Sequence, residues 1–243
     1  MSSERDLQGM SALVTGATSG IGRAVATELA AAGAEVFVHG RDARRGRAVV
    51  DAIAAAGGTA RFVAADLTEM AELDRLARQV GTVDVLVNNA GFAWYGPTGQ
   101  LDAATFDRLF AANVRAPYFL VAALGPMMAS RGSGSIINIG SRAGQIGRAG
   151  GAAYSATKAA LASLTRTWAA EFSPAGVRVN TVAPGPVRTD GVPPDRIAAL
   201  AATTVLGRAA QPGEIAPLVA FLASPRSGYI TGALVPVDGG STG

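Results

Sequence analysis

The fold is decided by the stretch Thr15-Gly16-Ala17-Thr18-Ser19-Gly20-Ile21-Gly22. Residues 11–15 are typical of a short buried strand. An Ala- and Leu-rich segment after the glycines predicts an amphipathic helix to Ala32, and Gly33 ends it. A second strand is predicted over residues 35–39. This order of elements binds a dinucleotide pyrophosphate, because glycines let the backbone approach the phosphates and the helix N-terminus offers free N–H groups. A glycine triplet in a chain with 31 glycines can also be an ordinary loop, but the flanking strand and helix favour the cofactor site.

The rest of the chain continues the alternation of helices and short apolar strands. Helices are predicted over residues 43–56, 69–80, 102–130, 197–200 and 212–222 and in a segment ending at residue 172, and strands over 60–64, 83–87, 135–139, 177–182 and 233–237. We therefore predict an α/β fold, a Rossmann-type doubly wound parallel sheet of about seven strands with helices on both faces. We expect a single domain over residues 1–243, in which residues 1–9 form an N-terminal tail and residues 186–211 form a mobile cover over the substrate.

Composition narrows the class of protein. In 243 residues, 49% are hydrophobic and only 16% are charged, which favours a large buried core over disorder. The chain has no cysteine, so disulfides and thiolate metal sites are excluded, and we expect no metal. A net charge of +3 with scattered arginines disfavours nucleic-acid binding. The polar first residues lack a signal-peptide core and the apolar runs are too short to span a bilayer, so we expect a cytoplasmic protein with no membrane partner.

The end of the second predicted strand indicates which dinucleotide is bound. NAD-binding folds usually place an acidic residue there for the ribose 2′-hydroxyl. This chain has Gly40 at that place, followed by Arg41, whose guanidinium suits the 2′-phosphate of NADP. The alternative is a solvated basic turn that opens the next helix. Asp66, after the third strand, either accepts from the adenine amino group or caps the following helix, and both can hold.

Residues 141–158 contain a plausible acid–base centre. Ser141 follows a buried strand, and Tyr154 and Lys158 lie four residues apart on a predicted helix, so their side chains share one face. Alone, such a pair is usually a surface helix contact. A free tyrosine has a pKa of about 10, and catalysis near neutrality needs it about two or three units lower. A neighbouring lysine, joined by an oxidised nicotinamide, can supply a shift of that size.

Asparagines mark two further positions. Asn88-Asn89-Ala90-Gly91 follow the fourth strand, where we expect the amides to face the ligand crevice of a parallel sheet, although a turn with no ligand has the same pattern. Asn113 lies on an apolar helix face and needs hydrogen-bond partners or a bound water. Pro117 is expected to kink that helix.

Together, residues 11–240 resemble the compact, single-domain branch of the short-chain dehydrogenase/reductase family. The resemblance is carried by Thr15-Gly16-x-x-x-Gly20-Ile21-Gly22, Asn88-Asn89-Ala90-Gly91, Asn113, Ser141, Tyr154-x-x-x-Lys158 and Pro184-Gly185. The approach Asn138-Ile139-Gly140-Ser141 and the tail Val235-x-Val237-Asp238-Gly239-Gly240 resemble 3-oxoacyl-(acyl-carrier-protein) reductase-like members.

The resemblance implies a role for each residue of the centre. Tyr154 would be the general acid that protonates a carbonyl oxygen as hydride arrives, and Ser141 would hold that oxygen. Lys158 would contact the nicotinamide ribose and lower the pKa of the tyrosine, and Asn113 would hold a water in a proton relay. The only histidine, His39, lies near the adenosine side, so no histidine-based triad is available to this pocket.

The resemblance also implies the ligand contacts. NADPH or NADP, with NAD as the less favoured cofactor, would contact Gly16, Thr18, Ser19, Gly20, Ile21, Gly22, Gly40, Arg41, Asp66, Leu67, Asn89, Ala90, Gly91, Tyr154, Lys158, Pro184, Gly185, Val187 and Thr189. The substrate would contact Ser141, Tyr154, Trp94, Tyr95, Gln145 and Ile146. Many NADP-using relatives have a basic residue where this chain has Ser19, which leaves Arg41 as the phosphate ligand.

The expected reaction is reduction of a small ketone or an acyl thioester to a secondary alcohol. Relatives that act on acidic carrier proteins present basic docking residues; Arg131 could serve, but residues 173–176 offer none. Homotetramers are common in the family, and we expect Leu161, Leu164 and Trp168 on the outer face of the Tyr154 helix to pack against a partner. Two alternatives remain: an NAD-dependent alcohol dehydrogenase that runs in the oxidative direction, and a non-catalytic dinucleotide-binding protein on the same fold.

Overall fold

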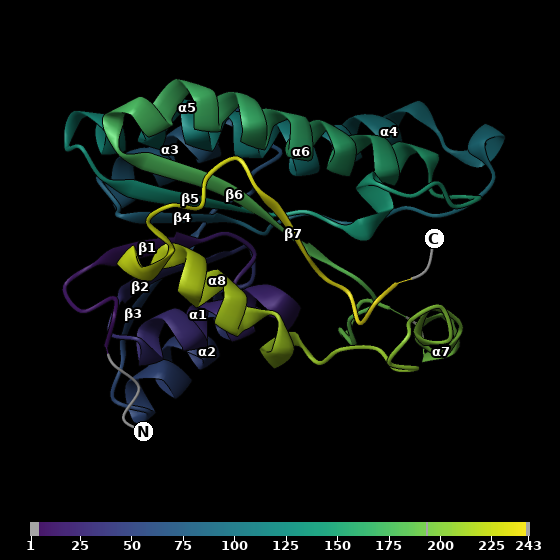
Figure 1. The fold of residues 1–243 in the computed structure, drawn as a ribbon, viewed down its shortest axis with the longest axis horizontal. Helices are drawn as coiled ribbons and strands as arrows, with labels where there is room; N and C mark the ends of the chain where they lie inside the picture. Colours follow the sequence, from purple (N-terminus) through teal and green to yellow (C-terminus); the bar gives the residue numbers. More distant parts are fainter. Residues whose placement is uncertain (1–4, 193, 242–243) are drawn as a thin grey trace.

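A computed structural model describes residues 5–192 and 194–241. These residues form one sheet of seven strands in the order β3-β2-β1-β4-β5-β6-β7, and every neighbouring pair is parallel (Figure 1). The strands are β1 (Ser11–Val14), β2 (Glu35–Gly40), β3 (Thr59–Ala64), β4 (Val85–Asn88), β5 (Gly134–Ile139), β6 (Val177–Pro184) and β7 (Leu234–Val237). This order confirms the predicted Rossmann-type doubly wound sheet.

Helices cover both faces of the sheet. The structure has α1 (Gly20–Ala31), α2 (Ala43–Ala55), α3 (Met70–Val80), α4 (Ala103–Phe110), α5 (Ala116–Ser130), α6 (Ala152–Phe172), α7 (Pro194–Ala201) and α8 (Ala216–Ala223). Figure 1 shows α1, α2 and α8 below the sheet, α3 to α6 above it, and α7 apart from both layers. Short 3-10 turns are η1 (Thr98–Gln100), η3 (Arg142–Gly144), η4 (Ser173–Ala175), η5 (Pro212–Glu214) and η6 (Pro225–Ser227). In the described part of the chain, no helix combines the length and apolarity needed to cross a membrane.

Both faces of each central strand are buried, which explains their continuous apolar sequences. Successive residues of a strand point to opposite faces. In β1, Ala12 and Val14 therefore pack in the core with α1 and α8, whereas Leu13 packs with α3, α5 and α6. Two apolar cores, one on each face, hold the strands in register.

The order of the strands in the sheet determines where the ligand crevice lies. β1 pairs with β4 although β2 and β3 intervene in the chain. The strand order therefore reverses at β1 and β4, and in such sheets ligands bind at the carboxyl ends of the strands at this point. The glycine turn leaves β1 here, and residues 89–91 leave β4 beside it.

The helical region predicted over residues 102–130 changes its hydrogen-bond pattern near its middle. A π-helical segment, Ala111–Arg115, separates α4 from α5, and within it the N–H of Ala116 bonds to the carbonyl of Ala111. Pro117 lies in the first turn of α5 and cannot donate to the carbonyl of Asn113, four residues earlier. The helical region is thus confirmed over residues 103–130, with an irregularity that precedes the proline. The kink expected at Pro117 stays a prediction.

The structure bears on two expectations about the surface. Residues 5–9 of the expected N-terminal tail pack on the fold, because Leu7 is fully buried and Asp6 pairs with Arg226 at 3.2 Å. Leu161 and Trp168 are core residues, only 1% and 5% exposed, so they cannot form an outer face. Residues 1–4 of the expected tail and Pro193 of the expected cover lie outside the described residues.

Candidate active site

The glycine turn after β1 fits a phosphate-bearing ligand. Gly16 and Gly20 have φ angles of 63° and 52°, a region that favours glycine. A Cβ on Gly22 would lie 2.3 Å from the carbonyl oxygen of Gly16, so the helix can start this close to the turn only with glycine there. The side chain of Ser19 does not cap α1, and the first turn of the helix has no acidic residue. The N–H groups of this helix end are therefore free to bind an anion.

Thr15 and Asn89 fasten the turn to the end of β4. The Oγ1 of Thr15 accepts from the N–H groups of Asn89 and Ala90 at 2.9 and 3.0 Å. The Nδ2 of Asn89 donates to the carbonyls of Thr15 and Gly16 at 2.9 and 3.1 Å. The expectation that both amides after β4 face the crevice was wrong for Asn88. Its Nδ2 donates to the Oδ1 of Asn138 at 2.9 Å, inside the core.

His39 links the turn to the next two strands. Its Nδ1 accepts from the N–H of Gly16 at 3.1 Å, so the proton lies on Nε2, which is 3.1 Å from the carbonyl oxygen of Ala65. Burial lowers the pKa of His39 to about 4, against the hydrogen bond to Ala65, which raises it. His39 is therefore neutral near pH 7 and supports the turn rather than taking part in proton transfer.

The end of β2 carries the residues expected at the adenosine side. A Cβ on Gly40 would lie 2.4 Å from the Cγ2 of Thr18, so a side chain here would collide with the turn. Arg41 is 76% exposed, and its guanidinium lies 3.6 Å from the Asp66 carboxylate. Hydrogen bonds from the backbone and hydroxyl of Thr68 lower the pKa of Asp66. Asp66 thus closes a turn before α3, and the alternative that it caps that helix was wrong, because Glu69 is the cap residue.

The structure brings Ser141, Tyr154 and Lys158 together. Ser141 precedes the turn η3, and its Oγ accepts from the N–H of Ala143 at 3.1 Å. The Ser141 side chain is also close enough to Tyr154 to oppose the rise in the pKa of that phenol. The Nζ of Lys158 donates to the carbonyl of Ile139 at 2.8 Å and lies 5.8 Å from the centroid of the Tyr154 ring. A Cβ on Gly144 would lie 2.8 Å from the backbone of α6, so this glycine lets the Ser141 turn pack onto the helix.

Burial sets the acidity of this group. It raises the pKa of Tyr154, and the Ser141 side chain only partly opposes the rise. Burial lowers the pKa of Lys158 to about 8. The expected lowering of the tyrosine pKa by its lysine is not produced by the protein groups alone, because both side chains are desolvated and the ammonium is held at the Ile139 carbonyl.

Asn113 connects three elements around the centre. Its Nδ2 donates to the Phe92 carbonyl at 2.9 Å and to the Oγ1 of Thr157 at 3.1 Å, and its Oδ1 accepts from the Phe92 N–H at 3.1 Å. A Cβ on Gly91 would lie 2.5 Å from that Oδ1. Thr157 donates in turn to the Tyr154 carbonyl at 2.7 Å. Sequence reasoning missed Thr157, for which the only signal is its place one turn after Tyr154.

Four further residues expected to contact substrate lie in different surroundings: Trp94, Tyr95, Gln145 and Ile146. The ring centroid of Tyr95 lies 5.6 Å from that of Tyr154. The ring of Trp94 packs over Gly96, where an added Cβ would lie 2.8 Å from it. Gln145 is exposed and accepts from Arg142, and Ile146 is half-buried on the same turn. Tyr95 is thus the one of these four with a ring contact to Tyr154.

The expected cover begins beside the glycine turn. A Cβ on Gly20 would lie 3.2 Å from the Cγ2 of Thr189, and Val187 is buried and bridges to Ala210. The other expected contacts on this side are Pro184, which ends β6; Gly185, which packs on Asp238; Ile21, in the first turn of α1; and Leu67, buried after β3. Arg142 pairs with Asp238 at 2.8 Å, a link between the turn after Ser141 and the end of β7 that the sequence did not reveal. Within the described ranges, no group of three or more His, Asp or Glu side chains could hold a metal.

This chain is similar to a known protein family, to proteins of known activity and to solved structures. The family model described as Enoyl-(Acyl carrier protein) reductase matches residues 16–242. The cis-4-hydroxycyclohexanecarboxylate dehydrogenase of Sinomonas cyclohexanicum is 41% identical over 239 residues, which cover 95% of this chain and 96% of the relative. A solved structure described as a short chain dehydrogenase/reductase family protein is 51% identical, with a TM-score of 0.90 and coverage of 97% of this chain and 98% of the other.

Two further solved structures show the cofactors of such proteins. A blue fluorescent protein from a metagenomic library, in complex with NADPH, is 38% identical, with a TM-score of 0.91 and coverage of 97% and 98%. A 7α-hydroxysteroid dehydrogenase, complexed with NADH and 7-oxo glycochenodeoxycholic acid, is 34% identical, with a TM-score of 0.93 and coverage of 100% and 98%. This chain belongs to the short-chain dehydrogenase/reductase family and is an NAD(P)-dependent oxidoreductase.

Proposed function

We propose that the protein reduces a ketone to a secondary alcohol with NADPH, and that Tyr154 donates the proton. The observation that carries the proposal is the placement of Tyr154 and Lys158 on the same face of α6, with the Lys158 Nζ 5.8 Å from the centroid of the Tyr154 ring. The Ser141 side chain is close enough to the phenol to oppose the rise in its pKa. The group lies at the carboxyl edge of the sheet, where the glycine turn fits a dinucleotide. When bound, the cofactor supplies the hydride.

The roles of the side chains follow from their chemistry. The Ser141 hydroxyl is close enough to Tyr154 to affect the pKa of its phenol, so both hydroxyls are proposed to reach one carbonyl oxygen, which Ser141 orients while Tyr154 protonates it. A raised pKa keeps the phenol protonated until it is used. The Lys158 cation then stabilises the phenolate that remains. The Asn113 amide fixes residues 91–92 against α6, and in this role it is a positioning residue. The water that Asn113 is expected to hold in a proton relay stays a prediction.

NADPH is proposed over NADH because of Gly40 and Arg41. A carboxylate that would repel a 2′-phosphate is absent at position 40, and Arg41 supplies an exposed guanidinium next to it. The competing pair with Asp66 is exposed and worth about 1 kcal/mol at most. A hydrogen bond to a charged group contributes about 1.5–3 kcal/mol, so a phosphate can displace Asp66 as the partner.

An NAD-dependent dehydrogenase that oxidises an alcohol is the second candidate. One neighbour is described with NADH, and the Sinomonas relative is named a dehydrogenase. The two candidates differ in cofactor preference, so the dissociation constants of NADPH and NADH distinguish them. Tighter binding of NADH would favour the second candidate.

The substrate proposed is a free ketone, a class that includes coenzyme A thioesters, rather than a thioester bound to a carrier protein. Arg131, the residue expected to dock an acidic carrier, pairs with Asp84 at 3.3 Å and donates to the Val83 carbonyl at 2.7 Å, so its charge is already used within the fold. The test is an NADPH-oxidation screen against cyclic ketones, sugars, quinones and acetoacetyl thioesters, with identification of the alcohol product. Cofactor binding with no turnover on any ketone would contradict the proposal and leave a non-catalytic dinucleotide-binding protein.

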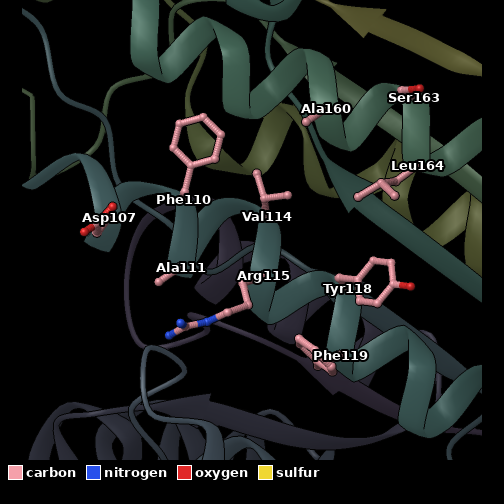
Figure 2. Close-up of a pocket in the computed structure, with 10 residues that line it drawn as sticks. All are labelled: Asp107, Phe110, Ala111, Val114, Arg115, Tyr118, Phe119, Ala160, Ser163 and Leu164. Carbon is pink, nitrogen blue, oxygen red and sulfur yellow. The ribbon is translucent and has the colours of Figure 1, made fainter. Parts of the chain in front are cut away.

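We also propose that the protein is a homo-oligomer, up to the tetramer common in the family, and that a second copy covers a groove between the α4–α5 region and α6. The groove has a volume of about 760 Å³ and includes Phe110, Tyr118, Phe119 and Leu164, of which Tyr118 is 46% exposed (Figure 2). Exposed aromatic surface of this kind usually marks a protein contact. Light scattering of the wild type and Leu164→Asp tests this, with dissociation expected for the variant. A monomeric wild type would contradict it.

A further inference from the structure

Arg196, in the expected substrate cover, lies against the ring of Tyr95, which is next to the proposed proton donor Tyr154. The Cζ atom of Arg196, in α7, is 3.4 Å from the centroid of the Tyr95 ring. Tyr95, in the loop after β4, is in ring contact with Tyr154 at 5.6 Å. Two contacts therefore connect a cation of the cover to the proposed proton donor.

A second arginine approaches from the catalytic loop. Arg148 lies between Ser141 and Tyr154 in the chain, and its Nη2 donates to the Oγ1 of Thr203, after α7, at 3.0 Å. Both Arg148 and Arg196 oppose the rise in the pKa of Tyr95 that burial causes, so both charges are felt at that phenol. The two loops are also joined directly, because the N–H of Gly96 donates to the Gly150 carbonyl at 2.9 Å.

Neither arginine has a carboxylate partner in the described part of the chain. Among the described residues, no carboxylate lies within 4.0 Å of Arg148 or Arg196, although Asp195 is adjacent in α7. By contrast, Arg142 of the same loop pairs with Asp238 at 2.8 Å. Both unpaired arginines are half-buried, where screening by water is weaker than at an exposed site. Planar guanidinium forks match the oxygens of carboxylates and phosphates.

We propose that the ketone substrate carries an anionic oxyacid group and that Arg196 and Arg148 bind it beside Tyr154. This inference rests on the proposed ketone reduction and specifies its substrate class. The anion is either a carboxylate on a small keto acid or a phosphate on a longer thioester arm, because a guanidinium binds both in the same way. Tyr95 carries Arg196 on its ring and holds it in place, so binding of the anion also holds α7 over the site.

The test compares matched anionic and neutral ketones. One pair is 4-oxopentanoate and its methyl ester, and the other is acetoacetyl-coenzyme A and acetoacetyl-N-acetylcysteamine. The variants are Arg196→Gln, Arg148→Gln and Arg196→Lys. Arg78→Gln, on the exposed face of α3, is the control because it changes the net charge equally, far from the site. The readout is the ratio of kcat/KM for the anionic member of a pair to that for the neutral member.

The wild type should prefer the anionic member of at least one pair. Losing a hydrogen bond to a charged group costs about 1.5–3 kcal/mol, so Arg196→Gln should lower that ratio about 10- to 100-fold, mainly through KM. Arg196→Lys should keep part of the preference for the anionic member. The control Arg78→Gln should leave the ratio as it is in the wild type. A response of the keto-acid pair identifies a carboxylate, and a response of the thioester pair identifies a phosphate.

A purely structural role for the arginines predicts another result. If they only hold the cover, Arg196→Gln lowers kcat/KM equally for both members of each pair, and the unchanged ratio overturns the inference. Calorimetric binding of 4-oxopentanoate, its methyl ester and both thioesters to the protein with NADP⁺ gives a readout without turnover. Weaker binding of the anionic member in Arg196→Gln supports the anion site even if no ketone is reduced, an outcome that would refute only the proposed function. Equal binding of both members of both pairs refutes the anion site.

Discussion

The Nζ atom of Lys158 lies 5.8 Å from the centroid of the Tyr154 ring and is held by the Ile139 carbonyl at the end of β5. The strand thus fixes the position of a cation on the helix face that carries the phenol. With its pKa lowered to about 8, Lys158 is still mainly protonated at pH 7. The Lys158 ammonium is therefore available beside Tyr154 at neutral pH, and its charge is lost as the pH rises above its pKa of about 8.

Replacing Lys158 should show that ketone reduction depends on the charge of this residue. In the wild type, kcat/KM for ketone reduction should fall as pH rises through about 8, because deprotonation removes the cation that stabilises the Tyr154 phenolate. Lys158→Met should lower kcat about 100-fold or more at pH 7 and lose this limb of the profile. Lys158→Arg, which keeps its charge at high pH, should move the limb upward. A pH profile of Lys158→Met identical to that of the wild type would contradict this role.

The bond between Asn113 and Thr157 predicts coupled losses of stability. Asn113→Leu removes the partner of the Phe92 backbone and of the Thr157 hydroxyl, and Thr157→Val leaves one N–H of the buried Asn113 amide without its acceptor, so each should lower the free energy of unfolding by about 1–3 kcal/mol. The double variant should lose less than the sum, since the two changes remove the same bond. Urea denaturation measures this, with Thr167→Val on the exposed face of α6 as the control. Strict additivity would show that the contact is not made.

Arg41 should determine the choice of cofactor. Arg41→Ala should weaken NADPH binding about 10- to 100-fold, since a charge-assisted phosphate contact is lost, and leave NADH binding nearly unchanged. Fluorescence titration of the reduced cofactors gives both dissociation constants. Arg47→Ala, exposed on α2, removes the same charge as a control. An equal loss for both cofactors, or tighter NADH binding by the wild type, would refute the assignment.

His39 should make the fold sensitive to acid. Its folded pKa of about 4 lies below the ordinary value of 6.5, so between these values the unfolded chain binds more protons than the folded one. Stability is therefore lost as pH falls, by about 2 kcal/mol between pH 7 and pH 5. His39→Gln removes this contribution, so its unfolding free energy should change less over the same interval. Equal pH dependence of the two proteins in urea denaturation would show that His39 is not buried as a neutral side chain.

The sequence was sufficient to predict the sheet because its strands are buried on both faces and read as apolar runs between glycine turns and helices. Asn113 and the proposed catalytic residues Ser141, Tyr154 and Lys158 could be singled out for a similar reason. The glycine turn, the asparagines after β4 and the Tyr-x-x-x-Lys spacing are local patterns, each tied to one element.

The features that were missed depend on contacts between distant elements. Asn88 and Asn89 are neighbours in the chain, but consecutive strand residues point to opposite faces, so only one of them reaches the glycine turn. The π-helical segment and the Thr157 contact form where α4, α6 and the loop after β4 meet. The pairing of Arg142 with Asp238 joins residues almost a hundred positions apart. No local pattern contains such information.

The central claim is that Tyr154 donates the proton during ketone reduction, and Tyr154→Phe tests it most directly. The measurement is kcat for an accepted ketone together with the dissociation constant of NADPH, for the wild type and the variant. Loss of a general acid costs about 10²- to 10⁴-fold in rate, so kcat should fall by that factor while NADPH binding stays nearly constant. An unchanged kcat would contradict the assignment of Tyr154 as the proton donor.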